Sequence, residues 1–210
     1  MLIKVCGMRE PENIRQVEAL GVDWMGFIFY ERSPRYIGNP AYEETACVRA
    51  IRESPLRKVG VFVNATPETM METAARYHLD YLQLHGNESP ETCYALHKRG
   101  YALIKAFSIA GEDDLKPTCD YEGRVDYFLF DTKCSGYGGS GKPFDWSVLE
   151  AYKGETPFLL SGGICPESAE AIRHFRHPRL AGIDLNSGFE TKPGLKDAER
   201  LKKFIDKIKK

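Results

Sequence analysis

The chain has 210 residues, which is enough for one domain with a buried core. Its composition is ordinary for a globular protein, with 42% hydrophobic residues and with 29 Lys and Arg against 30 Asp and Glu. The formal net charge of −1 provides no overall field that would attract nucleic acid or an anionic membrane, so any anion must be bound by a local site.

No segment approaches the ~20 consecutive apolar residues of a membrane span, and residues 1–5 have the pattern of a strand rather than of a signal peptide. We therefore expect a cytoplasmic protein without nucleic-acid or membrane partners. The six cysteines form no C-x-x-C pair and no short Cys/His cluster with zinc spacing, so we expect free thiols and no metal site.

Eight short apolar runs alternate along the chain with polar segments of helical periodicity. The runs predict strands at Leu2–Cys6, Trp24–Phe29, Lys58–Val63, Tyr81–Leu84, Ala102–Phe107, Tyr127–Asp131, Phe158–Ser161 and Ala181–Leu185. The other segments predict helices at Glu12–Leu20, Ala41–Ile51, Glu68–Tyr77, Glu91–Lys98, Trp146–Ala151, Pro166–Phe175 and Lys196–Ile208. A fifth helix, between Ile109 and Cys119, is expected to be short or irregular because Gly111 and Pro117 interrupt it.

The alternation of strands and helices predicts parallel strands joined by right-handed crossovers. An open doubly wound sheet has the same order of elements, but eight units of about 26 residues each, with no segment to spare, favour a closed barrel. We predict an α/β protein with one domain over residues 1–210, a single-domain (β/α)₈ TIM barrel. Its ligand would bind at the carboxyl ends of the strands.

Two glycine-containing turns follow the seventh and eighth predicted strands, where phosphate sites recur in this fold. Gly162 and Gly163 allow the backbone to approach an oxyanion closely, and Asn186 and Ser187 begin a segment whose N–H groups can bind it. We therefore predict a small phosphorylated ligand, although tight turns alone would also explain these glycines.

A third glycine-rich segment, residues 136–142, has the G-x-x-x-x-G-K spacing of a nucleotide-binding P-loop. Pro143 occupies the position of the Ser or Thr that would hold magnesium, so we do not expect ATP binding. A loop that closes over the substrate fits this segment better.

Cys6 and Asp131 end the first and sixth predicted strands and are candidates for an acid–base pair. Asp131 follows four apolar residues, and such surroundings are expected to favour its protonated form. Cys6 could be activated as a thiolate by nearby cations, but a packing role explains a buried cysteine equally well.

These residues are part of a longer, ordered series of motifs. The series includes Ile3-Lys4-Val5-Cys6-Gly7, Ser33-Pro34-Arg35-Tyr36, Gln83-Leu84-His85-Gly86, Asp131-Thr132-Lys133, Leu160-Ser161-Gly162-Gly163 and residues 184–188. Taken together, and over essentially its whole length, the chain resembles the phosphoribosylanthranilate isomerase family of tryptophan biosynthesis.

The resemblance implies an isomerase that needs no cofactor and no metal, and that carries out the Amadori rearrangement of N-(5-phosphoribosyl)anthranilate to 1-(2-carboxyphenylamino)-1-deoxyribulose 5-phosphate. It implies that Asp131 is the general acid that protonates the furanose ring oxygen, and that Cys6 is the general base that removes the C2 proton. Arg35 is implied to pair with the anthranilate carboxylate, a task suited to a planar bidentate donor.

Phosphate binding is implied for Gly162, Gly163, Asn186 and Ser187. The family motif usually reads Asp-Val-Ser-Ser-Gly-Val-Glu, and here Asn186 replaces the first Ser. Asn keeps a polar side chain and the backbone N–H, so we expect phosphate binding to be retained. Asp184 corresponds to a family position near the substrate, and an inward structural hydrogen bond would explain it nearly as well.

Two alternatives stay open, another phosphosugar barrel enzyme and a non-catalytic phosphosugar-binding module. An acid–base pair of two aspartates would indicate a histidine-pathway isomerase, and metal-binding histidines would indicate a pentose-phosphate epimerase. This chain instead has Cys6 at the end of the first predicted strand. A binding module would leave Cys6 and Asp131 without a task. Both a monomer and a homodimer are compatible with the sequence.

Overall fold

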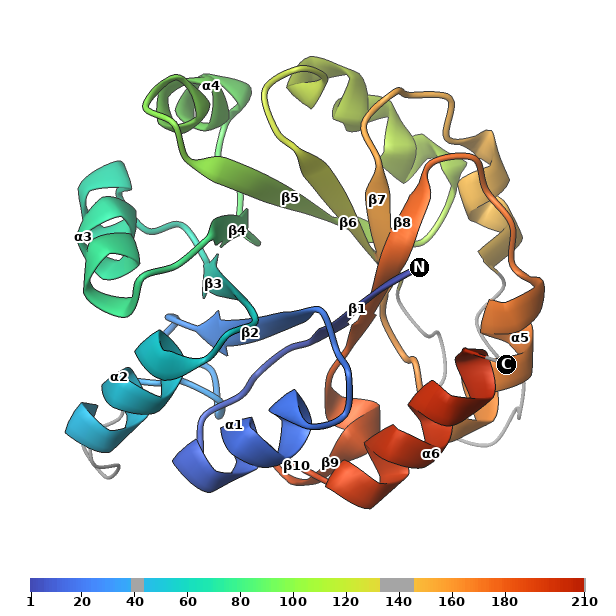
Figure 1. Ribbon diagram of the computed structural model, residues 1–210. Coiled ribbons are helices and arrows are strands. Elements are labelled where there is room, and N and C mark those ends of the chain that lie inside the picture. Colours follow the sequence, from blue (N-terminus) through green and yellow to red (C-terminus); the bar gives the residue numbers. More distant parts are fainter. Residues whose placement is uncertain (39–43, 133–145, 210) are drawn as a thin grey trace.

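In the computed structural model, which describes residues 1–38, 44–132 and 146–209, eight parallel strands close into a barrel in chain order (Figure 1). The strands are β1 (Leu2–Val5), β2 (Trp24–Ile28), β3 (Arg57–Phe62), β4 (Tyr81–Leu84), β5 (Ala102–Ile109), β6 (Tyr127–Thr132), β7 (Phe158–Ser161) and β8 (Leu180–Leu185). Each agrees with its predicted range to within two residues at either end. The predicted TIM barrel is therefore confirmed.

The helices lie outside the barrel, as Figure 1 shows. They are α1 (Pro11–Glu18), α2 (Glu44–Glu53), α3 (Pro67–Tyr77), α4 (Pro90–Lys98), α5 (Ala169–His174) and α6 (Ala198–Ile208). Proline starts α1, α3 and α4, and before two of these helices the side chains of Thr66 and Ser89 accept hydrogen bonds from the backbone N–H groups of Thr69 and Thr92.

Among the described residues, the connections after β5, β6 and β7 contain 3₁₀ helices, a form that the helical periodicity does not distinguish. The irregular fifth connection is η1 (Glu112–Tyr121), with Pro117 inside it. The predicted helix over residues 146–151 is η2 (Trp146–Ala151), and the one expected from Pro166 starts as η3 (Pro166–Ser168) before α5.

The prediction was wrong at the start of the last helix. A short 3₁₀ helix, η4 (Ser187–Phe189), is followed by an antiparallel hairpin of β9 (Glu190–Lys192) and β10 (Leu195–Lys196). The helix α6 begins only after Asp197, whose carboxylate accepts a hydrogen bond from the Arg200 N–H at 2.9 Å and caps the helix. Lys196 is therefore a strand residue, and its side chain is buried.

Side chains that alternate along each strand form two separate cores. The barrel interior is filled by Trp24, Val59, Ile104, Ala106, Leu129 and Leu159. The opposite faces of the strands pack against the helices, with Phe128 and Phe130 among the fully buried side chains there. Because Leu129 points inward, Asp131 two residues later also points inward, at the carboxyl end of the barrel.

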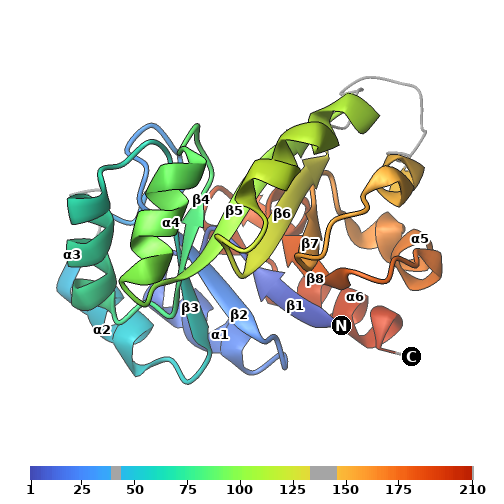
Figure 2. The same cartoon turned by 90° about the horizontal axis from the view of Figure 1, so that it is seen from above.

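The N-terminus, at the start of β1, and the end of α6, near α5, lie toward the same side of the molecule (Figures 1 and 2). The Lys209 ammonium donates a hydrogen bond to the Gly21 carbonyl at 2.8 Å and ties the end of α6 to the connection between α1 and β2. Within the described ranges, no helix is long and apolar enough to span a bilayer.

A buried ion pair fixes the loop after β4. Lys105 and Glu88 are 3.2 Å apart, and only 3% of each side chain is exposed. The Lys105 ammonium also donates to the carbonyls of Leu84 and Gly86, while the Glu88 carboxylate accepts from the N–H groups of Asn64 and Gly86. The ends of β3, β4 and β5 are thereby held together, with His85 between two of the anchored residues.

Replacing Lys105 by Met should leave the Glu88 carboxylate buried without its cation. We expect the free energy of unfolding to fall by about 3 kcal/mol, the usual cost of breaking a buried pair, when it is measured by urea denaturation. Lys98→Met is the control, because Lys98 lies exposed on α4 and its loss should change stability by less than about 0.5 kcal/mol. Equal stability of the two variants would contradict this role of Lys105.

Candidate active site

A cavity opens at the carboxyl ends of the strands. Its walls bring together Cys6 after β1 with residues from β2, β3, β4, β6, β7 and β8 and from loops that follow these strands. The lining residues are Cys6, Ile28, Val61, Gln83, His85, Asp131, Ser161, Gly162, Gly163, Ile164, Asp184, Asn186 and Ser187. Of the eight predicted site residues, only Arg35 does not line this cavity.

An ion pair lies below the cavity floor. Lys4 on β1 is opposite Asp184 on β8, and its ammonium is 3.0 Å from Asp184 Oδ1. The Lys4 side chain is fully buried and that of Asp184 is 5% exposed. Burial raises the pKa of the Asp184 carboxyl, and Lys4 offsets this only in part. Burial opposes the charge of Lys4, but Asp184 and Cys6 outweigh it and raise the pKa of the ammonium.

Cys6 follows Lys4 on the same inner face, and its N–H donates to the Leu185 carbonyl at 2.8 Å. Burial raises the pKa of the Cys6 thiol, while Lys4 and Lys196 act in the opposite direction. The activating cations that the sequence suggested are therefore present. Burial outweighs them, so the thiol form predominates at neutral pH.

The β2 strand makes room for this thiol at Gly26. A Cβ atom on Gly26 would lie 2.7 Å from Cys6 Sγ, closer than two such atoms can pack. Any side chain at this position would displace the sulfur from the cavity, so the shape of the neighbouring strand controls where Cys6 lies.

Asp131 has a different environment from the one that its sequence neighbours suggested. The apolar residues before it do not enclose the carboxylate, because Phe128 and Phe130 point toward the helices. Its side chain is 38% exposed and opens into the cavity. This carboxylate can therefore reach a ligand directly.

His85 is a titratable neighbour of Asp131, with Nε2 at 3.6 Å from Oδ2. The ring is held by the Gln83 amide, whose nitrogen lies 2.8 Å from His85 Nδ1. When the amide nitrogen donates, Nδ1 accepts and Nε2 carries the hydrogen that faces Asp131. The sequence suggested that His85 and Gln83 shape the cavity, and both do line it.

The loops after β7 and β8 form the opposite wall. Gly162 and Gly163 have φ values of 92° and 61°, a region that favours glycine, so the backbone turns sharply here. Gly188 packs directly on the Ile164 carbonyl, and a side chain at this position would push the two loops apart. Residues of both loops therefore meet at the wall of the cavity.

Arg35 comes from the loop after β2 and lies at the edge of the site. Its guanidinium forms a salt bridge with Glu190, with Nη2 at 2.6 Å from Oε2. A Cβ atom on Gly7 would lie 2.7 Å from Arg35 Cδ and 2.8 Å from Asn186 Oδ1, so these side chains meet over the residue that follows Cys6. Glu190 is the last residue of the motif that begins at Asp184, but the sequence had not indicated its pairing with Arg35.

The glycine-rich segment at residues 136–142, for which a closing loop was predicted, lies outside the described residues, as does Pro143. Within the described part of the chain, no group of three or more His, Cys, Asp and Glu side chains is arranged to hold a metal ion.

Comparison with known proteins gives a consistent result. A family model described as N-(5'-phosphoribosyl)anthranilate (PRA) isomerase matches residues 3–207. A protein from Parabacteroides distasonis named N-(5'-phosphoribosyl)anthranilate isomerase is 69% identical over 208 residues, which are 99% of this chain and 93% of that protein. One of the same name from Phocaeicola vulgatus is 53% identical over 210 residues, which are 100% of this chain and 98% of the other.

Solved structures are also similar. The phosphoribosyl anthranilate isomerase from Thermotoga maritima superimposes with a TM-score of 0.83 at 35% identity, over 100% of this chain and 98% of that one. A structure described as phosphoribosyl anthranilate isomerase in complex with reduced 1-(o-carboxyphenylamino)-1-deoxyribulose 5-phosphate has a TM-score of 0.82 at 31% identity, with the same coverage.

The raised pKa of Cys6 can be tested by alkylation. Since only the thiolate reacts, the rate of Cys6 modification by iodoacetamide should have its midpoint at a higher pH than the rate for a free cysteine. Lys4→Met should move this midpoint further upward. Exposed Cys119 serves as the internal control for reagent access, with labelling at each site read by peptide mass spectrometry. A Cys6 midpoint below that of free cysteine would contradict the electrostatic assignment.

Proposed function

The chain belongs to the N-(5'-phosphoribosyl)anthranilate isomerase family, and from that premise we propose that Asp131 and Cys6 carry the acid and base steps of its reaction. The protein is an isomerase of tryptophan biosynthesis that acts on N-(5'-phosphoribosyl)anthranilate. One observation carries the assignment of roles. A thiol after β1 and a carboxylate on β6 line one cavity, whose wall also contains two glycine-bearing turns.

In the first step, the protonated Asp131 gives its proton to the furanose ring oxygen. The bond between C1 and this oxygen breaks, and the lone pair of the anthranilate nitrogen forms a C1=N bond. The product is an open-chain Schiff base with a positive charge on nitrogen, and Asp131 is left as a carboxylate. The partial exposure of Asp131 supports this role, because the group must reach a ligand and regain its proton from solvent.

In the second step, the Cys6 thiolate removes the proton from C2. The electrons of the C2–H bond form a C1=C2 bond, and the electrons of the C=N bond return to nitrogen and neutralise its charge. The resulting enol-amine tautomerises to the ketone by losing the hydroxyl proton on O2 and gaining a proton at C1. The sum is an isomerisation with no change in oxidation state overall.

The two ends of the substrate call for two anion-binding groups. We assign the phosphate to the backbone N–H groups of Gly162, Gly163, Asn186 and Ser187, which border the same part of the cavity. We assign the anthranilate carboxylate to Arg35, beside that cavity. Asp184 lies at the floor with Lys4, which supports a place next to the reacting sugar carbons.

Two alternative functions fit the site less well. The other phosphosugar barrel enzymes considered would have an aspartate pair or metal-binding histidines in place of the pair formed by Cys6 and Asp131. A non-catalytic binding module would have no use for an acid–base pair. We propose that the enzyme acts in the cytoplasm, as a monomer or a homodimer, on this small phosphorylated substrate alone and without nucleic-acid or membrane partners. A cofactor or metal has no step to perform in the proton transfers described.

Loss of either proton-transferring group should abolish most of the activity. We expect Cys6→Ser and Asp131→Asn each to lower kcat by at least ~100-fold, the lower end for acid–base groups, as measured by the loss of substrate fluorescence without added metal. Cys119→Ser, at an exposed cysteine, should keep full activity. Undiminished turnover in both variants would refute the assigned roles, and a wild-type protein that binds phosphate but never turns over would favour the binding module.

Arg35 should contribute mainly to binding. Arg35→Met should raise KM by roughly tenfold, the value of one hydrogen bond between charged groups, and should lower kcat less. The KM of Arg35→Lys should lie between those of the wild type and Arg35→Met, because lysine keeps the charge and loses the planar fork. Arg32→Met, at an exposed position in the same loop, is the control. A fall in kcat with an unchanged KM would contradict a role in binding the carboxylate.

A further inference from the structure

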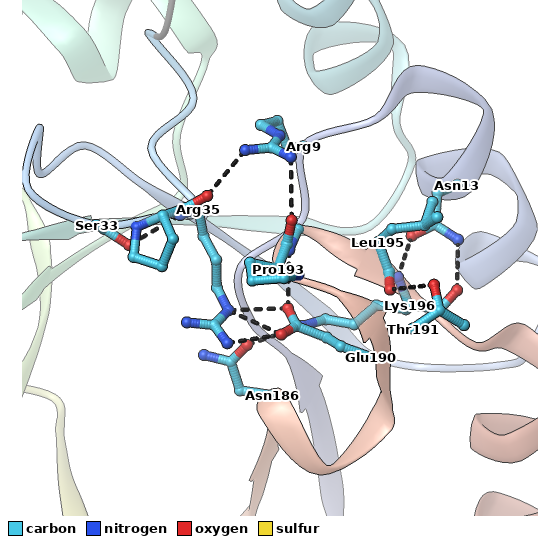
Figure 3. Close-up of polar contacts among 12 residues, drawn as sticks. Arg9, Asn13, Ser33, Arg35, Asn186, Glu190, Thr191, Pro193, Leu195 and Lys196 are labelled. Carbon is cyan, nitrogen blue, oxygen red and sulfur yellow. Dashed lines mark hydrogen bonds and ion pairs between the residues drawn. The ribbon is translucent and has the colours of Figure 1, made fainter.

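Four side chains connect the two anion-binding ends of the site (Figure 3). We call Arg35, Asn186, Glu190 and Lys196 the Glu190 cluster. The Arg35 guanidinium donates from Nε to Glu190 Oε1 at 2.8 Å and from Nη2 to Oε2 at 2.6 Å. The Lys196 ammonium donates to Glu190 Oε1 and to Asn186 Oδ1, both at 2.7 Å. Contacts therefore run without a break from Arg35 to the loop after β8.

The cluster is buried and carries an excess of positive charge. The Lys196 side chain is fully buried, Glu190 is 5% exposed and Arg35 is 19% exposed. Two cations share one carboxylate, so the formal charge of the cluster is +1. Burial alone would raise the pKa of Glu190, but Arg35 and Lys196 outweigh it and hold that pKa below its usual range. Such a cluster can accept an anion beside it, whereas Arg35 paired with Glu190 alone would be neutral.

The hairpin of β9 and β10 places Glu190 opposite Lys196. Its backbone is fixed from the other side by Asn13, which accepts a hydrogen bond from the Lys196 N–H at 2.7 Å and donates to the Lys196 carbonyl at 2.9 Å. Arg9 holds the turn by donating to the Pro193 carbonyl at 3.0 Å. Figure 3 shows these anchors on the side of the cluster that faces α1. The ammonium is therefore held at one position between its two acceptors.

We infer that Lys196 is a positioning residue that couples the two ends of the site. Through Glu190 it orients the Arg35 guanidinium, and through Asn186 Oδ1 it holds the start of the loop that follows β8. This inference rests on the proposed function for the identity of the two substrate ends. It also assigns a task to the side chain of Asn186, which binds Lys196 and leaves phosphate binding at this residue to the backbone N–H.

A purely structural role of Lys196 would predict a different result from a coupling role. A structural lysine would lower stability when replaced and leave ligand affinity unchanged in the protein that stays folded. A coupling lysine affects two anions that do not touch it. Inorganic phosphate reports on the loops after β7 and β8, and anthranilate reports on Arg35, so inhibition by each compound probes one end of the site separately.

The experiment compares the inhibition constants of these two probes for the wild-type enzyme and its variants. Lys196→Met should weaken inhibition by both phosphate and anthranilate by about tenfold, which is the value of one charged hydrogen bond at each end of the site. The same change should raise KM more than it lowers kcat. Asn186→Ala should weaken inhibition by phosphate only. Lys192→Met is the matched control, because Lys192 lies exposed on the same hairpin and should change neither constant.

The double variant Lys196→Met with Asn186→Ala provides the decisive comparison. Both changes remove the same contact. Phosphate should therefore inhibit the double variant as weakly as it inhibits Lys196→Met alone. Additive losses, or unchanged inhibition constants in Lys196→Met, would overturn the inference while wild-type turnover still supported the proposed function. If Lys196→Met melts below the assay temperature, Lys196→Met with Glu190→Gln removes both buried charges, and the same loss of inhibition by phosphate is expected. Absence of wild-type turnover would instead count against the proposed function.

Discussion

Strands β1 and β8 close the barrel in a register that places Lys4 opposite Asp184, with their charged groups 3.0 Å apart. Side chains alternate along a strand, so Cys6 must follow Lys4 on the inner face. A slip of β1 by one residue would turn Lys4 into the apolar layer under the helices and leave Asp184 unpaired inside the barrel, and an unpaired buried charge costs several kcal/mol. One buried ion pair therefore specifies the closure of the barrel and the position of the thiol together.

Two carboxylates of the cavity differ because of what surrounds them. Asp184 is enclosed at the floor and is tied to Lys4, so it is not placed to exchange a proton freely with solvent. Asp131 is 38% exposed and faces His85 at 3.6 Å, so it can meet a ligand directly. The fold thus places one carboxylate in a buried ion pair and the other at an open wall, and depth in the barrel rather than residue type makes the difference.

Local patterns were sufficient for the strands, since each apolar run is bounded by polar residues. The ends of these runs then pointed to Cys6, Asp131 and the two glycine-containing turns. The hairpin of β9 and β10 was missed because its strands have only three and two residues, too few for alternation to show. Lys196 was assigned to the last predicted helix for the same reason. Its true neighbour, Glu190, is brought to it by the hairpin, and Arg35 comes from the other end of the chain. Contacts of that kind depend on the closed barrel, and no local period encodes them.

The protonation of Cys6 places a condition on the order of the proposed steps. Burial keeps the thiol neutral in the absence of a ligand, although Lys4 and Lys196 favour the thiolate. In the proposed first step, proton donation by Asp131 creates a cationic Schiff base at C1, and that charge would both acidify the C2–H bond and add a third positive group near the sulfur. The base therefore becomes most effective after the acid has acted. With this order, a reactive thiolate is favoured only while its substrate is open, so the burial of Cys6 suits a base that must be inert between turnovers.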